Sequence, residues 1–113
     1  MDNDIKAITE AIKQTVDCEK IYLFGSYAYG EPDENSDLDF YVVIPDDSSM
    51  RPIEAMRVIR KNIRQINRGT PVDILAARSS RFAEMSALPT MERKIAKDGV
   101  VLYEQNGLGQ RMA

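Results

Sequence analysis

The sequence contains no histidine, and this absence narrows the chemistry that the protein can perform. Without an imidazole, Ser-His-Asp and Cys-His catalysis and histidine-ligated zinc sites are excluded. Cys18 is the only cysteine, so neither an internal disulfide nor a cysteine metal cluster can form within the chain. By contrast, eighteen Asp and Glu residues are present. If the protein is an enzyme, carboxylates and a hard metal ion are therefore the expected tools.

Long apolar runs and an excess of positive charge are also missing. No apolar run approaches the ~20 residues that cross a bilayer, and the charged N-terminus lacks the apolar stretch of a signal peptide. We therefore expect a cytoplasmic protein. Fifteen Lys and Arg against eighteen acidic residues give a net charge of -3, so we do not expect direct binding of nucleic acids through bulk charge. The 113 residues, of which 43% are hydrophobic, suit one domain with a real core.

Hydrophobic periodicity and turn residues predict a single α/β (α+β) domain with a mixed sheet of about four strands and helices mainly on one face. The domain is expected to cover residues 1–104, and residues 105–113 are expected to form a flexible tail. One predicted helix begins at Pro52, and the others have as their expected N-caps Asn3 or Asp4, Ser79 or Ser80, and Thr90. The predicted strands are 21–24, 38–44, 72–76 and 100–103.

The clearest loop, residues 25–35, begins with Gly25 and Ser26 directly after the first predicted strand. Glycine permits close approach of the backbone, and exposed N–H groups in a tight turn can hold phosphate oxygens. The hydroxyl of Ser26 adds another donor. Gly25 and Ser26, together with Ser36 at the far end of the loop, are the candidate residues for binding a phosphorylated substrate.

Three aspartates follow this loop and are the candidate catalytic and metal-binding residues. Asp37 and Asp39 would project from the same face of a strand, about 7 Å apart at Cα, where two carboxylates repel each other unless a cation bridges them. Asp73 lies in an apolar run, where a lone carboxylate is costly without a partner. If its strand lies beside the strand of Asp39, Asp73 could reach the same ion and help to deprotonate an attacking hydroxyl. A phosphate cradle beside such a site would suit phosphoryl or nucleotidyl transfer.

The pattern of Gly25-Ser26, ten residues, Asp37-x-Asp39 and a later strand aspartate resembles the polymerase-β-type nucleotidyltransferase superfamily. Within it, the chain is most similar to the minimal nucleotidyltransferases over residues 21–103. This resemblance implies that Asp37, Asp39 and Asp73 bind Mg²⁺, as two ions, and that Ser26 holds the phosphates of an NTP, with ATP expected. Many relatives carry an arginine where this chain has Tyr27 or Tyr29.

The resemblance also implies a partner, because members paired with a HEPN-domain protein act as antitoxins. Some of them transfer AMP to a tyrosine of the toxin, and the shortness of this chain likewise places the acceptor hydroxyl on another molecule. Two alternatives remain: an antitoxin that neutralises its partner by contact alone, and, ranked lower, transfer to a small molecule such as an aminoglycoside. The oligomeric state, with itself or with a partner, stays open.

The helix predicted from Pro52 to Ile66, with Gly69 as its C-terminal cap, carries a basic stripe. Its members are Arg57, Arg60, Lys61, Arg64 and Arg68. Such a stripe could meet an acidic partner or RNA phosphates, but a solvated face is the favoured interpretation, and no aromatic residues are interleaved with it.

Overall fold

In the computed structural model of this protein, the described residues are 2–30, 32, 36–66 and 69–105. The elements in chain order are α1 (Asp2–Thr15), β1 (Lys20–Phe24), α2 (Ser26–Tyr29), β2 (Leu38–Ile44), α3 (Pro52–Ile63), β3 (Val72–Arg78), α4 (Ser79–Ser86), α5 (Met91–Asp98) and β4 (Val100–Glu104). Apart from Gln105, whose N–H donates to the carbonyl oxygen of Glu19 at 2.8 Å, the predicted tail lies outside the described residues. No helix in the described part of the chain is long and apolar enough to span a bilayer.

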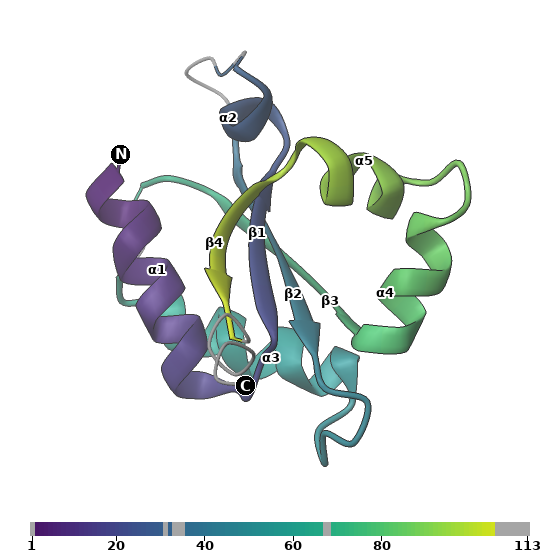
Figure 1. The fold of residues 1–113 in the computed structure, drawn as a ribbon. Coiled ribbons are helices and arrows are strands. Elements are labelled where there is room, and N and C mark those ends of the chain that lie inside the picture. The colour runs from purple at the N-terminus through teal and green to yellow at the C-terminus, as the bar shows by residue number, and fades with distance from the viewer. Residues whose placement is uncertain (1, 31, 33–35, 67–68, 106–113) are drawn as a thin grey trace.

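The four strands form one mixed sheet in the order β3-β2-β1-β4 (Figure 1). β1 lies in the middle and pairs antiparallel with both β2 and β4, whereas β2 and β3 run parallel. The helix α3 provides the crossover that a parallel pair requires. This topology confirms the predicted fold class. It also places β3 beside β2, which was the condition for Asp73 to lie near Asp39.

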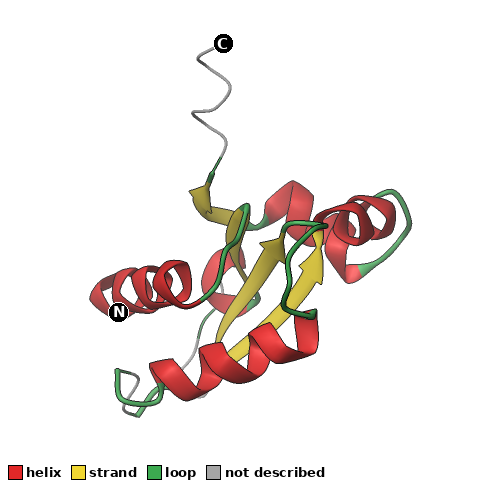
Figure 2. Ribbon diagram, turned by 90° about the horizontal axis from the view of Figure 1, so that it is seen from below, coloured by secondary structure: helices red, strands yellow, loops and turns green. Residues whose placement is uncertain are grey.

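Side chains alternate along the strands, and each face of the sheet has its own core. On one face, Leu38, Phe40 and Val42 of β2 pack with the apolar residues of α1 and α3. On the other face, Tyr41 and Val43 pack with residues of α4 and α5. Figure 2 shows the two pairs of helices on opposite sides of the strands. The expectation of helices mainly on one face therefore holds for the two long helices only, because the second face is also apolar and must be covered.

Several predicted boundaries shift in the structure. α1 begins at Asp2 instead of after Asn3 or Asp4, and α3 ends at Ile63 instead of Ile66. Because the buried face of α3 follows Ala55, Ile59 and Ile63, the exposed Ile66 gains nothing from extending the helix. Gly69 consequently lies outside α3, with a φ of 96°.

The caps of the last two helices differ in origin. Thr90 caps α5 as predicted, accepting a hydrogen bond from the N–H of Arg93 at 3.2 Å. The predicted serine cap of α4 is wrong, because Ser79 and Ser80 lie inside the helix. Instead, the carboxylate of Asp46, from the turn after β2, accepts the N–H of Ser80 at 2.8 Å. A cap from a distant turn leaves no local pattern in the sequence.

Candidate active site

The first predicted feature of the site, Gly25, lies where β1 ends and has a φ of 79°, a conformation that favours glycine. A Cβ at this position would overlap the carboxylate of Asp39. The backbone of Gly25 therefore lies so close to the Asp39 side chain that no room remains for a Cβ. Its carbonyl oxygen accepts the N–H groups of Ala28 and Tyr29, at 3.0 and 2.9 Å.

These hydrogen bonds make residues Ser26–Tyr29 a single helical turn, α2. The prediction of an irregular loop from Gly25 onwards is therefore wrong for this part. Four residues are too few to show helical periodicity, and the turn is packed in place through Tyr27 and Ala28 on one core and Tyr29 on the other. Residues 31 and 33–35 of the predicted loop lie outside the described residues.

The two strand aspartates are brought together by the parallel pairing of β2 and β3. Asp39 and Asp73 are direct Cα partners in this register, and Asp39 is also paired with Phe24, the residue before Gly25. The glycine turn and the two carboxylates therefore meet at one end of the sheet.

The other predicted residues, Ser36 and Asp37, come immediately before β2. The predicted strand 38–44 is confirmed residue by residue, so Asp37 lies just before β2, although its side chain was expected to alternate with the strand. It remains next to the site, because the following residue, Leu38, donates its N–H to the carbonyl oxygen of Pro71 at 2.9 Å, which joins the starts of β2 and β3.

The electrostatics of Asp39 reflect this crowding. Burial, and then the negative charges of Asp73 and Asp37, raise the pKa of Asp39 from 3.8 to about 6. A carboxylate surrounded in this way favours either a proton or a cation. Within the described part of the chain, however, no three acidic or cysteine side chains are arranged so that they could enclose a metal ion by themselves. A cation here would need further oxygen ligands from elsewhere.

Arg60 of α3 contacts the candidate site, a placement that the sequence did not reveal. Its Nη2 atom lies 3.7 Å from Oδ1 of Asp73 and donates a hydrogen bond to the carbonyl oxygen of Ile74 at 3.0 Å. One residue of the predicted basic stripe, Arg60, therefore contacts the candidate site. Its neighbours Arg57, Lys61 and Arg64 are exposed, which all three interpretations of the stripe require, and Arg68 lies outside the described residues.

We expect Arg60→Met to destabilise the protein by about 0.5–1 kcal/mol, because it removes a half-exposed ion pair and a hydrogen bond to the backbone. Urea denaturation in the absence of divalent ions measures this loss. The matched control is Lys61→Met, which removes an exposed cation from the adjacent position of the same helix. Equal stabilities of the two variants would contradict the assigned role of Arg60.

A mixed four-stranded sheet in this order, with a glycine turn closing onto a strand carboxylate and a second carboxylate on the adjacent parallel strand, is the arrangement of a nucleotidyltransferase domain. The sequence matches the family described as polymerase beta, nucleotidyltransferase, over residues 6–107. The protein belongs to this family. No curated protein matches the sequence.

Solved structures share the fold at low sequence identity. A protein of Sulfolobus solfataricus, described provisionally as a nucleotidyltransferase, is 23% identical with a TM-score of 0.61, and the match covers 92% of this chain and 80% of that one. A toxin–antitoxin structure with AMP-PNP is also 23% identical, with a TM-score of 0.63 and coverage of 93% and 76%. A mutant of the toxin–antitoxin pair MntA-HpeT is 20% identical, with a TM-score of 0.61 and coverage of 89% and 73%.

Proposed function

We propose that this protein is an Mg²⁺-dependent nucleotidyltransferase that moves AMP from ATP to a hydroxyl of a partner protein. The partner is a HEPN-domain toxin, and the transfer neutralises it, so the protein acts as an antitoxin. One observation carries the proposal: Asp39 and Asp73 are register partners at the same end of the sheet where Gly25 closes onto Asp39.

The donor atoms at this site fit Mg²⁺ better than a softer metal. Asp37, Asp39 and Asp73 offer carboxylate oxygens only, and Mg²⁺ accepts one or two carboxylates together with water and substrate phosphates. Burial, and then the charges of Asp73 and Asp37, raise the pKa of Asp39, and a divalent ion beside this carboxylate would favour its ionised form. When bound, the ion would neutralise negative charge on the phosphates during transfer.

Each residue then has a distinct task in the proposed transfer. Gly25 and Ser26, with Ser36, hold the phosphates of ATP, and Asp37 and Asp39 are the metal ligands. The acceptor oxygen forms a bond to the α-phosphorus, the bond to pyrophosphate breaks, and the hydroxyl proton passes to a carboxylate. Asp73 is suited to accept this proton, because it is half-exposed and adjacent to Asp39.

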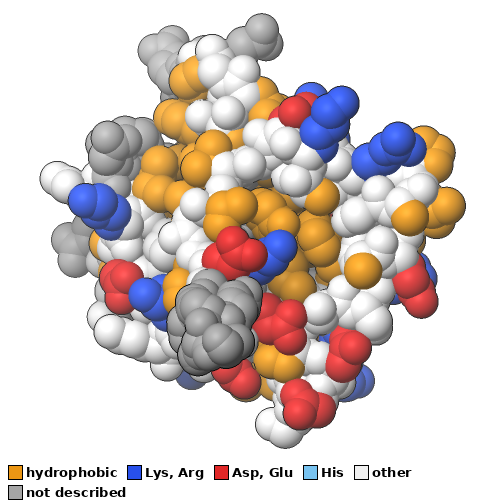
Figure 3. Space-filling model, viewed as in Figure 1, with side chains coloured by type: hydrophobic (Ala, Val, Ile, Leu, Met, Phe, Trp, Pro, Cys, Tyr) orange, Lys and Arg blue, Asp and Glu red, His pale blue; other side chains and the backbone are white. Residues whose placement is uncertain are grey.

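The partner is supported by the surface and by the fold relatives. β4 is an edge strand on which Val100 and Val101 are 42% and 49% exposed, so it offers an apolar strand to another protein. Figure 3 shows further apolar side chains gathered between the sheet and α4–α5. Two solved structures with this fold come from toxin–antitoxin complexes, one of them with AMP-PNP.

A second candidate, an antitoxin that acts by contact alone, is favoured by one observation. Asp73, the proposed third carboxylate, is already paired with Arg60 at 3.7 Å. A guanidinium in this position could take the place of a metal ion and leave a fold that binds its partner without catalysis.

Incubation with the HEPN partner, Mg²⁺ and α-labelled ATP separates these two functions. We expect label on the partner, lost in Asp37→Ala plus Asp39→Ala and retained in the control Asp47→Ala, which alters an exposed residue in the turn after β2. Neutralisation of the toxin by the double variant, without any labelling by the unaltered protein, would instead establish action by contact.

A further inference from the structure

A cation from the other end of the chain lies beside the turn that follows Gly25. The Nζ atom of Lys94, in α5, lies 4.4 Å from the centroid of the Tyr29 ring. Tyr29 is the last residue of α2 and therefore belongs to the same turn as Gly25. A side chain about seventy positions away in the sequence thus joins this region only through the fold.

The fold fixes α5 in this place through its C-terminal end. The N–H of Gly99 donates to the carbonyl oxygen of Ile95 at 2.8 Å and ends the helix. A Cβ on Gly99 would lie 3.3 Å from the carbonyl oxygen of Leu23 and 2.6 Å from that of Ile95. Only glycine lets the end of α5 approach β1 so closely, beside the strand that leads into Gly25.

Charged groups of α5 and of the carboxylate site both act on Tyr29. Burial raises the pKa of the Tyr29 hydroxyl, while Lys94 and a hydrogen bond from the backbone of Gly25 lower it and the negative charges of Asp98 and Asp39 raise it. The ring of Tyr29 is thus in contact with the ammonium of Lys94, and its hydroxyl also responds to the charge of Asp39.

Negative charge predominates at this end of the sheet, so binding of a triphosphate there would require a further cation. Asp37, Asp39 and Asp73 are negative, residues 25–30 contain no Lys or Arg, and Arg60 is engaged with Asp73. ATP brings about four more negative charges, which require more compensation than a divalent ion alone supplies.

The ammonium of Lys94 is available for this purpose. Its side chain is 57% exposed and pairs with Oδ2 of Asp98 at 3.3 Å, one turn further along α5. An exposed i,i+4 pair of this kind stabilises a helix by only about 0.3–0.5 kcal/mol, so a phosphate can replace Asp98 at little cost.

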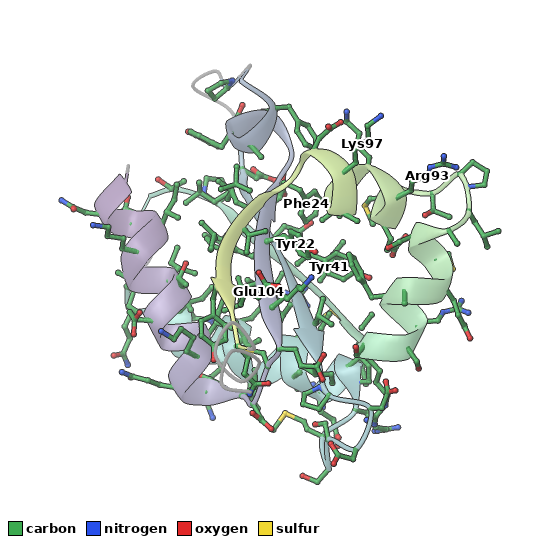
Figure 4. All side chains as sticks on the ribbon, viewed as in Figure 1. Tyr22, Phe24, Tyr41, Arg93, Lys97 and Glu104 are labelled. Carbon is green, nitrogen blue, oxygen red and sulfur yellow. The ribbon has the colours of Figure 1, made fainter. Side chains whose placement is uncertain are left out.

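We propose that Lys94 is a substrate-binding residue that contacts the β- or γ-phosphate of the nucleoside triphosphate and exchanges Asp98 for it. The inference rests on the proposed function, because it assigns a further ligand of the same substrate. α5 also contains the matched control: Arg93 and Lys97 share a different face of the helix from Lys94 and Asp98 and project outward from it (Figure 4).

Calorimetric titration with α,β-methylene ATP, which cannot lose pyrophosphate, tests the assignment at constant Mg²⁺. Lys94→Gln should weaken binding about tenfold, the effect of losing one charge-assisted contact, whereas Lys97→Gln should change it less than about twofold. AMP, which lacks the outer phosphates, should bind the unaltered protein and Lys94→Gln equally. Thermal unfolding of both variants checks that neither substitution disturbs the fold.

The possible failures can be distinguished. If Lys94→Gln and Lys97→Gln behave alike, or if AMP is weakened as much as the analogue, the assignment of Lys94 is overturned while the proposed function stands. If the unaltered protein does not bind the analogue at all, both proposals fail.

The ion pair between Lys94 and Asp98 supplies a second test, in which binding of the analogue should become tighter instead of weaker. Asp98→Asn releases Lys94 and should tighten binding of the analogue about threefold, an effect that a purely structural pair would not produce. The gain should disappear in the double variant Lys94→Gln, Asp98→Asn, because it depends on Lys94. A gain that persists in the double variant would overturn the exchange of Asp98 for phosphate.

Discussion

Replacement of Asp39 by asparagine is expected to lower nucleotidyl transfer on the order of a thousandfold and, at the same time, to stabilise the metal-free protein at pH 8. The two effects have one cause. Asp39 keeps a negative charge in a place where burial and two neighbouring carboxylates oppose it, and its pKa rises to about 6. A group of this kind costs stability when it is ionised, and the proposed reaction would use its charge to hold the metal ion.

The dependence of this effect on pH has a definite sign. Because the pKa of Asp39 is raised above its ordinary value of 3.8, its favourable contribution to stability is fully present below that value and is lost as the pH rises through about 6. A shift of this size corresponds to about 3 kcal/mol, which solvent screening of a partly exposed side chain reduces to about 1 kcal/mol. Asp39→Asn should therefore show this gain at pH 8 and no gain at pH 3.5.

Chemical denaturation at the two pH values, together with the labelling assay, measures both parts of the prediction. Asp47→Asn is the matched control, since it removes an exposed carboxylate of the turn after β2 and should leave stability and transfer unchanged within about 0.5 kcal/mol. A loss of stability at pH 8 in Asp39→Asn, or transfer at an unaltered rate, would contradict the assigned environment of Asp39.

Gly25→Ala is expected to be the most damaging small substitution in the chain. Alanine at φ 79° and ψ -162°, a region that essentially only glycine adopts, costs about 1–3 kcal/mol, and its Cβ would in addition overlap the carboxylate of Asp39, so the strand end or the carboxylate must move. We expect a loss of about 3 kcal/mol in the free energy of unfolding. Transfer should fall about a hundredfold or more, because a displacement of about 1 Å at a reacting group has this effect.

Gly30→Ala separates the two causes of this loss. Gly30 ends α2 in the left-handed region, with φ 89° and ψ 13°, whereas Gly25 combines φ 79° with ψ -162°, and a Cβ on Gly30 would have no atom within 4 Å. The control therefore carries the cost of a left-handed residue without any overlap, and it should lose about 1 kcal/mol with transfer retained. Thermal or urea unfolding and the labelling assay would show the difference. Equal losses in the two variants would mean that the approach of Gly25 to Asp39 does not matter.

Much of the architecture could be predicted from local patterns. The apolar alternation of 38–44 placed Leu38, Phe40, Val42 and Ile44 on one core face, which the structure confirms. Helices and strands were expected in the right order, because each has a periodic pattern of apolar residues or a run of β-branched residues. Such patterns can be recognised from the segment alone. The exception is α2, whose four residues are too few to show a period.

What could not be predicted has a common physical origin in contacts between distant segments. Tyr41 was one of several aromatic strand residues in the sequence, yet in the structure its hydroxyl donates to Oε2 of Glu92 at 3.0 Å and ties β2 to α5. The carboxylate of Asp46 caps α4 in the same way, across the turn after β2. The two partners of such a pair have no fixed spacing in the sequence, so no sequence pattern predicts them. They meet only when the elements pack together.

The sequence by itself determined the family and the identity of the candidate acidic residues, because the spacing of Gly25-Ser26 and Asp37-x-Asp39 and the apolar surroundings of Asp73 are local properties of the chain. The tertiary structure decided which groups accompany them. Parallel pairing of β2 and β3 places Asp73 beside Asp39, and packing of α3 and α5 around the sheet brings Arg60 to Asp73 and Lys94 to Tyr29. Charges on separate helices become neighbours only through folding, so no single segment of the sequence could have revealed them.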